Sequence, residues 1–155
     1  MATILLAEDS YYFRAAVALY LRSKGFEVAC AVDGEEAMRL LRERPIDLVL
    51  LDLRMPKFDG VDVLAAIRSD PHLRNIPVLM MTAATTPLLE FHLRPSVQAW
   101  LVKASVGLSQ LLDCIRTHSR GATFQPIQAP PTPPEAARKP MAHEPKRPMP
   151  AEPNL

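Results

Sequence analysis

The segment DLVLLDLRMPKFDG, residues 47–60, decides the fold of this chain. Its apolar residues form a run of the length of a buried strand, and Asp52 follows them. The segment after Asp52 ends on an Asp-Gly pair, and a helix is predicted from Val61 to about Ser69. A buried strand that leads through a turn into a helix is typical of a sheet covered by helices.

Three other short apolar runs end in polar residues in the same way. TILLA precedes the acidic pair Glu8-Asp9, VLMM precedes Thr82, and AWLV precedes Lys103. Runs of this length, bounded by polar or turn residues, are typical of buried strands of a parallel sheet. We therefore expect three carboxylates, a hydroxyl and an amine to converge at one edge of the sheet.

Residues 1 to about 120 alternate strand-like with helix-like segments, which predicts an α/β fold with a doubly wound, five-stranded parallel sheet. The strands are expected near Thr3 to Ala7, Glu27 to Ala31, Leu48 to Leu53, Val78 to Thr82 and Trp100 to Lys103. The helices are expected over Ser10 to Lys24, Asp33 to Leu41, Val61 to Ser69, a short segment from Pro87 that ends before Arg94, and Ser105 to His118. In the last helix, the side chains expected to face inward are those of Leu108, Leu111, Leu112 and Ile115.

The composition indicates a compartment and excludes several classes of partner. Cys30 and Cys114 lie far apart, with no Cys or His at metal-ligand spacing, which indicates reduced thiols. The N-terminal residues do not have the pattern of a secretory signal, and no apolar run approaches the roughly 18 residues needed to cross a bilayer. With 18 Lys and Arg against 17 Asp and Glu, the net charge of +1 offers no strong field for a polyanion. We expect a cytoplasmic protein with no membrane contact and no direct binding to nucleic acid.

The composition changes near Gly121, because ten of the sixteen prolines fall between that residue and Leu155. Large apolar residues are scarce there, so this part of the chain cannot bury a core. We expect one domain over residues 1–120 and a proline-rich, disordered tail over residues 121–155. Pro130 with Pro133 has PxxP spacing, so a tail without a dedicated receptor and a tail bound by a partner both stay open.

The convergent carboxylates predict a metal site beside a reactive aspartate. In an open parallel sheet, ligands bind outside the carboxyl ends of the strands, where Glu8, Asp9 and Asp52 fall. Like charges about 4 Å apart cost one another about 4 kcal/mol at an effective dielectric of about 20, so the cluster needs a cation or a proton. Oxygen ligands alone suit Mg²⁺. Asp52 is the expected nucleophile toward a phosphoryl group, with Thr82 and Lys103 contacting the phosphoryl oxygens.

Together these motifs resemble the receiver domain of bacterial two-component response regulators. The resemblance rests on Glu8-Asp9, LDLRMPKFDG from Leu51 to Gly60, MTA from Met81 to Ala83, and Lys103, and it covers about residues 3 to 118. It implies the flavodoxin-like receiver fold with strand order 2-1-3-4-5. It also implies a phosphoacceptor in phosphorelay signal transduction, which catalyses its own Mg²⁺-dependent phosphotransfer and dephosphorylation and is no enzyme in the ordinary sense. The implied partners are a sensor histidine kinase or phosphotransfer protein and an unknown downstream protein.

The resemblance also implies a role for each site residue. Asp52 accepts the phosphoryl group from a phosphohistidine. Four residues form the implied Mg²⁺ site: Asp9, Asp52, the backbone carbonyl of Arg54, and Glu8 through water. Three groups contact the phosphoryl oxygens: the Thr82 hydroxyl, the backbone N–H of Ala83 and the Lys103 ammonium. Thr82 and Trp100 occupy the coupled switch positions.

Several residues depart from the family pattern or add to it. Ala104 follows Lys103 where the family usually has proline, so we expect a trans peptide bond and a rearranged loop. Trp100 is larger than the usual residue at its position and donates only one hydrogen bond, so we expect an altered relay. The Arg54 guanidinium either reaches the phosphoryl group and lengthens the lifetime of the acyl phosphate, or faces solvent.

Three functions compete at this point. The leading one is a phosphorylation-dependent signalling module that acts through protein-protein contacts. The second is a phosphorylation-independent, receiver-like scaffold or binding module. The third is an Asp-nucleophile phosphatase of the haloacid dehalogenase type, which is disfavoured because Arg54 stands where such enzymes need an acidic proton donor. Uptake of a phosphoryl group or of beryllofluoride by Asp52 separates the first two.

Overall fold

The computed structural model of this chain describes residues 2–84 and 86–119. The strands are β1 (Thr3–Ala7), β2 (Glu27–Ala31), β3 (Leu48–Asp52), β4 (Val78–Thr82) and β5 (Ala99–Val102). The helices are α1 (Tyr11–Ser23), α2 (Gly34–Glu43), α3 (Gly60–Ser69), α4 (Pro87–Leu93), the 3-10 helix η1 (Arg94–Ser96) and α5 (Leu108–Ser119). All strand pairs are parallel, in the order β2-β1-β3-β4-β5, which confirms the expected fold. The tail expected over residues 121–155 lies outside the described residues.

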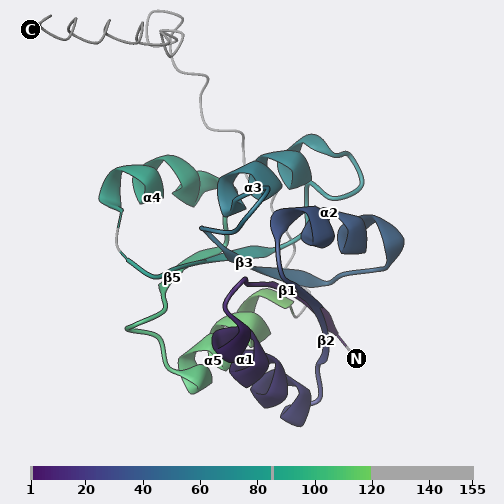
Figure 1. The fold of residues 1–155 in the computed structure, drawn as a ribbon, viewed down its shortest axis with the longest axis vertical. Coiled ribbons are helices and arrows are strands. Elements are labelled where there is room, and N and C mark those ends of the chain that lie inside the picture. The colour runs from purple at the N-terminus through teal and green to yellow at the C-terminus, as the bar shows by residue number, and fades with distance from the viewer. Residues whose placement is uncertain (1, 85, 120–155) are drawn as a thin grey trace, which may run out of the picture.

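The sheet lies between two layers of helices, with α1 and α5 on one face and α2, α3 and α4 on the other (Figure 1). Alternate residues of each central strand face opposite layers. In β3, Leu48 and Leu50 pack in the cluster under α1 and α5, whereas Val49 and Leu51 pack in the cluster under α2 and α3. A central parallel strand is buried on both faces, which explains its continuous apolar sequence.

Side-chain caps and prolines fix where the helices begin and end. The Asp33 carboxylate accepts the N–H of Glu36 at 2.8 Å and starts α2. Asp59 and Asp62 form a reciprocal capping box at the start of α3. Pro87 occupies the first turn of α4, which ends before Arg94 as expected.

The segment after β5 differs from the sequence expectation. The helix begins at Leu108 and not at Ser105, because the N–H groups of Ser105 and Val106 both donate to the Val102 carbonyl and close a turn there. Leu108 is 40% exposed, so the expectation that it faces inward was wrong. The buried residues of α5 are Leu111, Leu112 and Ile115.

Two further expectations concern the backbone and the membrane. The described residues contain no cis peptide bond, so the trans bond between Lys103 and Ala104 is confirmed. Within the same residues, every helix is too short or too polar to span a bilayer. The cytoplasmic location stays a prediction.

Gly60 allows α3 to begin directly against the end of β3. A Cβ at this position would lie 2.3 Å from the Asp52 carbonyl oxygen and 2.8 Å from the Leu53 Cα, both of which are backbone atoms. The Gly60 N–H donates to the Leu53 carbonyl at 2.8 Å and fixes the same approach. The position of Asp52 therefore depends on the absence of a side chain at residue 60.

We predict that Gly60→Ala lowers the free energy of unfolding by about 1–3 kcal/mol, because the backbone of Asp52 and Leu53 must move to make room for the methyl group. Denaturant unfolding measures the effect. Gly107→Ala is the matched control, since the nearest atom to its added Cβ lies 3.9 Å away, and it should change stability by less than about 0.5 kcal/mol. Equal stability of the two variants would contradict the prediction.

Candidate functional site

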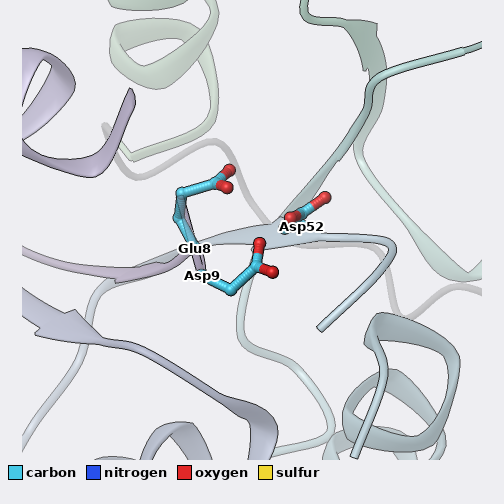
Figure 2. Close-up of side chains that lie close together, drawn as sticks. All are labelled: Glu8, Asp9 and Asp52. Carbon is cyan, nitrogen blue, oxygen red and sulfur yellow. The ribbon is translucent and has the colours of Figure 1, made fainter. Parts of the chain in front are cut away.

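Three carboxylates gather where β1 and β3 end (Figure 2). Glu8 and Asp9 follow β1, and Asp52 is the last residue of β3. One oxygen of each lies within 4.8 Å of the others. Glu8 is fully buried, Asp52 is buried and Asp9 is exposed, so one acidic residue of the cluster faces solvent. The expected convergence of the acidic residues is confirmed.

Lys103 brings the only ammonium that contacts this cluster among the described residues. Its Nζ lies 2.5 Å from Glu8 Oε2 and 3.2 Å from Asp52 Oδ2. Its backbone N–H donates to the Thr82 carbonyl at 2.8 Å, which keeps the lysine in line with the end of β4. One positive charge thus faces three negative ones, so the cluster has unbalanced negative charge.

Backbone contacts hold the acidic residues in place. The Ser10 N–H donates to Glu8 Oε1 at 3.0 Å, and the Arg54 N–H lies 3.4 Å from Asp52 Oδ1. Arg14 Nη1 donates to the carbonyl oxygens of Glu8 at 2.7 Å and Asp9 at 3.3 Å. Arg14 was not among the residues expected to build the site, and only its spacing after the acidic pair could have indicated such a role.

The Asp52 carboxyl is shifted toward its protonated form. Burial, followed by the negative charge of Glu8, raises the pKa of Asp52 to about 7, against the opposing effects of the Lys103 ammonium and the Arg54 N–H. Burial disfavours a charge and a neighbouring like charge adds to that cost. A cation beside the cluster would favour the ionised form of Asp52.

The loop between β3 and α3 is anchored on α2. Lys57, which has a left-handed backbone with φ of 67°, places its Nζ 3.4 Å from Asp33 Oδ2 and 3.3 Å from Glu35 Oε2. At Gly34 the Phe58 carbonyl comes so close that a Cβ would lie 2.2 Å from its oxygen. These contacts fix the loop that contains Arg54.

A pocket of about 320 Å³ opens over the cluster. It is lined by Glu8, Asp9, Ser10, Asp52, Arg54, Thr82, Ala83, Ala84, Thr86 and Lys103. Every residue with an expected site role lines it except Trp100. The Thr82 hydroxyl donates to the Ala84 carbonyl at 2.7 Å and is therefore engaged by its own loop.

Trp100 lies apart from the pocket. Its side chain packs with the cluster under α2 and α3 and is 8% exposed. The indole N–H is buried and has no acceptor among the described residues. The coupled switch role of Thr82 and Trp100 stays a prediction.

The donor set fits a hard divalent cation. Three carboxylates offer oxygen atoms only, and Mg²⁺ and similar ions prefer oxygen ligands and often retain water. The unbalanced negative charge and the exposed Asp9 favour a cation that enters from solvent. The acidic cluster can therefore hold a metal.

Comparison with known proteins agrees with this geometry. The family model described as response regulator receiver domain matches residues 4–116. The uncharacterized transcriptional regulatory protein YcbL of Bacillus subtilis is 44% identical over 79 residues, which cover 51% of this chain and 34% of that protein. This chain thus matches about a third of the length of that relative.

Solved structures show the same fold. The chemotaxis protein CheY4 of Vibrio cholerae superposes with a TM-score of 0.71 at 29% identity, covering 76% of this chain and 98% of CheY4. The response regulator TrrA of Thermotoga maritima, solved in complex with Mg²⁺-BeF, has a TM-score of 0.65 at 26% identity, with coverage of 76% and 98%. With its strand order, its acidic cluster and a family match over most of its length, the chain belongs to the response regulator receiver domain family.

Proposed function

We propose that this receiver domain is a phosphoacceptor, and that Asp52 receives a phosphoryl group from the phosphohistidine of a sensor histidine kinase or phosphotransfer protein. The observation that supports this most strongly is the position of Asp52. Its Oδ2 lies 3.2 Å from the Lys103 ammonium, inside a group of carboxylates at the mouth of a pocket. Phosphoryl transfer requires mainly positioning and neutralisation of charge, which such an arrangement supplies.

The proposed step is a displacement at phosphorus. An oxygen of the ionised Asp52 carboxylate attacks the phosphorus atom, and an O–P bond forms while the P–N bond of the donor breaks. The imidazole nitrogen keeps the bonding electron pair and takes a proton from solvent. In the separate dephosphorylation step, water attacks phosphorus, the O–P bond to Asp52 breaks, and inorganic phosphate and the Asp52 carboxylate are released.

Each neighbouring residue has a proposed part in this step. Glu8, Asp9, Asp52 and the backbone carbonyl of Arg54 are the proposed holders of Mg²⁺, Glu8 through water. The ion would supply positive charge to the phosphoryl oxygens. The related response regulator TrrA was solved in complex with Mg²⁺-BeF, which supports the binding of Mg²⁺ together with a phosphoryl group by this chain. Lys103 and the backbone N–H of Ala83 would contact the remaining phosphoryl oxygens.

Thr82 would couple phosphorylation of Asp52 to a change in the conformation of the protein surface. Its hydroxyl must give up the Ala84 carbonyl in order to donate to a phosphoryl oxygen, which would move the loop before α4. Leu88 and Phe91 on α4 are 74% and 76% exposed, and large exposed apolar residues favour a protein partner. We therefore propose that output passes to a downstream protein through such contacts.

The first test is phosphoryl uptake. With Mg²⁺ and acetyl phosphate, we expect intact-mass measurement to detect one added phosphoryl group on the wild type and none on Asp52→Asn. Asp113→Asn, an exposed carboxylate on α5, is the matched control and should be phosphorylated normally. If neither acetyl phosphate nor beryllofluoride modifies the wild type, the phosphorylation-independent scaffold is the correct function.

The Arg54 side chain provides a second test. It is exposed, lines the pocket and forms no ion pair among the described residues, so its guanidinium is free to turn toward a phosphoryl group. We expect Arg54→Ala to accelerate dephosphorylation about two- to tenfold, the equivalent of one net hydrogen bond. Arg54→Lys keeps the charge without the bidentate geometry, so its dephosphorylation rate should lie between those of wild type and Arg54→Ala. Equal rates for wild type and Arg54→Ala would show that the side chain only faces solvent.

The raised pKa of Asp52 predicts a pH-dependent stability in metal-free protein. Because folding raises this pKa from 3.8 to about 7, the folded state prefers the protonated carboxyl, and its stabilising contribution is lost as pH rises toward 7. The side chain of Asp52→Asn cannot ionise. The free energy of unfolding of this variant minus that of wild type should therefore increase by up to about 1.4 kcal/mol per pH unit from pH 5 to 7. Denaturant unfolding with chelator measures this, and a pH-independent difference would contradict it.

A further inference from the structure

The side chain of Lys103 needs a fixed position, yet little of the chain after it holds it. Ala104 is exposed, and the next residues turn away from the sheet through hydrogen bonds to the Val102 carbonyl. A lysine has a long, flexible stem and loses substantial conformational entropy when its ammonium is fixed. Contacts from other elements must therefore set the position of the ammonium.

Phe13 of α1 supplies such a contact. The Lys103 Nζ lies 4.7 Å from the centroid of the Phe13 ring, within the range of a cation–π interaction. The ring is placed by α1, whose residues Val17 and Leu21 are buried against the sheet. The ammonium is thus bounded by two carboxylates and by one aromatic face, and its side chain is only 17% exposed.

The contacts of Lys103 differ in whether they persist during the proposed reaction. Asp52 becomes an acyl phosphate, and Glu8 belongs to the acidic cluster that would face a metal, so both ion pairs change. The Phe13 ring does not react. A cation–π contact needs the cation over the ring face but tolerates any position within about 6 Å of the centroid, so the ammonium can shift from the Asp52 carboxylate to a phosphoryl oxygen while it stays over the ring.

We propose that Phe13 is a positioning residue, whose ring keeps the Lys103 ammonium beside the reacting oxygen of Asp52 before and after phosphoryl transfer. The inference rests on the proposed function for its role in transfer, whereas the contact itself is independent of phosphorylation. Phe13 is not a catalytic residue, because its ring contacts the Lys103 ammonium and the apolar cluster under α1 and α5, and it does not line the pocket over Asp52.

A spectroscopic test examines the contact without phosphorylation. In metal-free protein, the ε-CH₂ protons of Lys103, assigned by their loss in Lys103→Arg, should be shifted upfield by the ring current. The shift should persist in Phe13→Tyr and vanish in Phe13→Leu and Phe13→Met, two ring-free variants of different shape. Tyr12→Leu, on an 84% exposed neighbour, is the matched control and should leave the shift unchanged. An unshifted wild type, or a shift that survives in the ring-free variants, overturns the inference.

A kinetic test examines the role in transfer. The rate constant for phosphorylation by acetyl phosphate with Mg²⁺ should fall about two- to thirtyfold in Phe13→Leu and Phe13→Met, which corresponds to a cation–π interaction of ordinary strength. Phe13→Tyr should restore most of the rate, and Tyr12→Leu should match wild type. In a Lys103→Met background, Phe13→Leu should have no further effect, and a further loss would show a merely structural role. If wild type takes up no phosphoryl group, the proposed function fails, while the ring-current measurement still decides the contact.

Discussion

The ion pairs of Lys103 are the contacts on which the site depends, because they neutralise carboxylates that are buried. Removal of a charge from water costs several kcal/mol unless a partner is close, and Glu8 is fully buried. The lysine follows β5, whereas Glu8 and Asp52 lie at the ends of β1 and β3. Since β4 separates β5 from β3, these ion pairs span the end of a strand that they do not belong to. The site therefore forms only when the four strands β1, β3, β4 and β5 are all assembled in the sheet.

The alternation of side chains explains why the site has two sides. Continuing the alternation of their strands, Glu8, Asp52 and Lys103 fall on the face covered by α1 and α5, where Phe13 also packs. Thr82 falls on the opposite face, under α4. The groups that hold the reacting oxygen and the group proposed to transmit its state thus belong to opposite layers. In the proposed function, a chemical event on one face would be transmitted to the other through Thr82, because Thr82 ends the strand that lies between Asp52 and Lys103.

Much of this could be predicted from the sequence, because apolar runs that end in acidic or basic residues determine both the strands and the edge where their ends meet. The bounds of β1, β2 and β4 follow directly from such runs. The start of α5 could not be predicted, because it is decided by hydrogen bonds of a turn and not by the apolar pattern that includes Leu108. The contacts of Arg14 and Phe13 were missed for another reason. Their spacing fits an ordinary amphipathic helix, and only the structure shows that Arg14 reaches the carbonyl oxygens of Glu8 and Asp9 and that the Phe13 ring lies against the Lys103 ammonium.

The balance of charge at the site constrains how a phosphorylated state can be stable. The free cluster has three carboxylates and one ammonium, and an aspartyl phosphate would replace one negative charge with nearly two. If Lys103 turns toward the phosphoryl oxygens, Glu8 loses its nearest positive charge while it stays buried. A buried carboxylate without a partner is more costly than the ion pair it came from, so a further cation is needed more after phosphoryl transfer than before it. Before transfer, a cation at the cluster would favour the ionised form of Asp52. After transfer, the same cation would partner the Glu8 carboxylate, so Lys103 could move to the phosphoryl oxygens without leaving a buried charge unpaired.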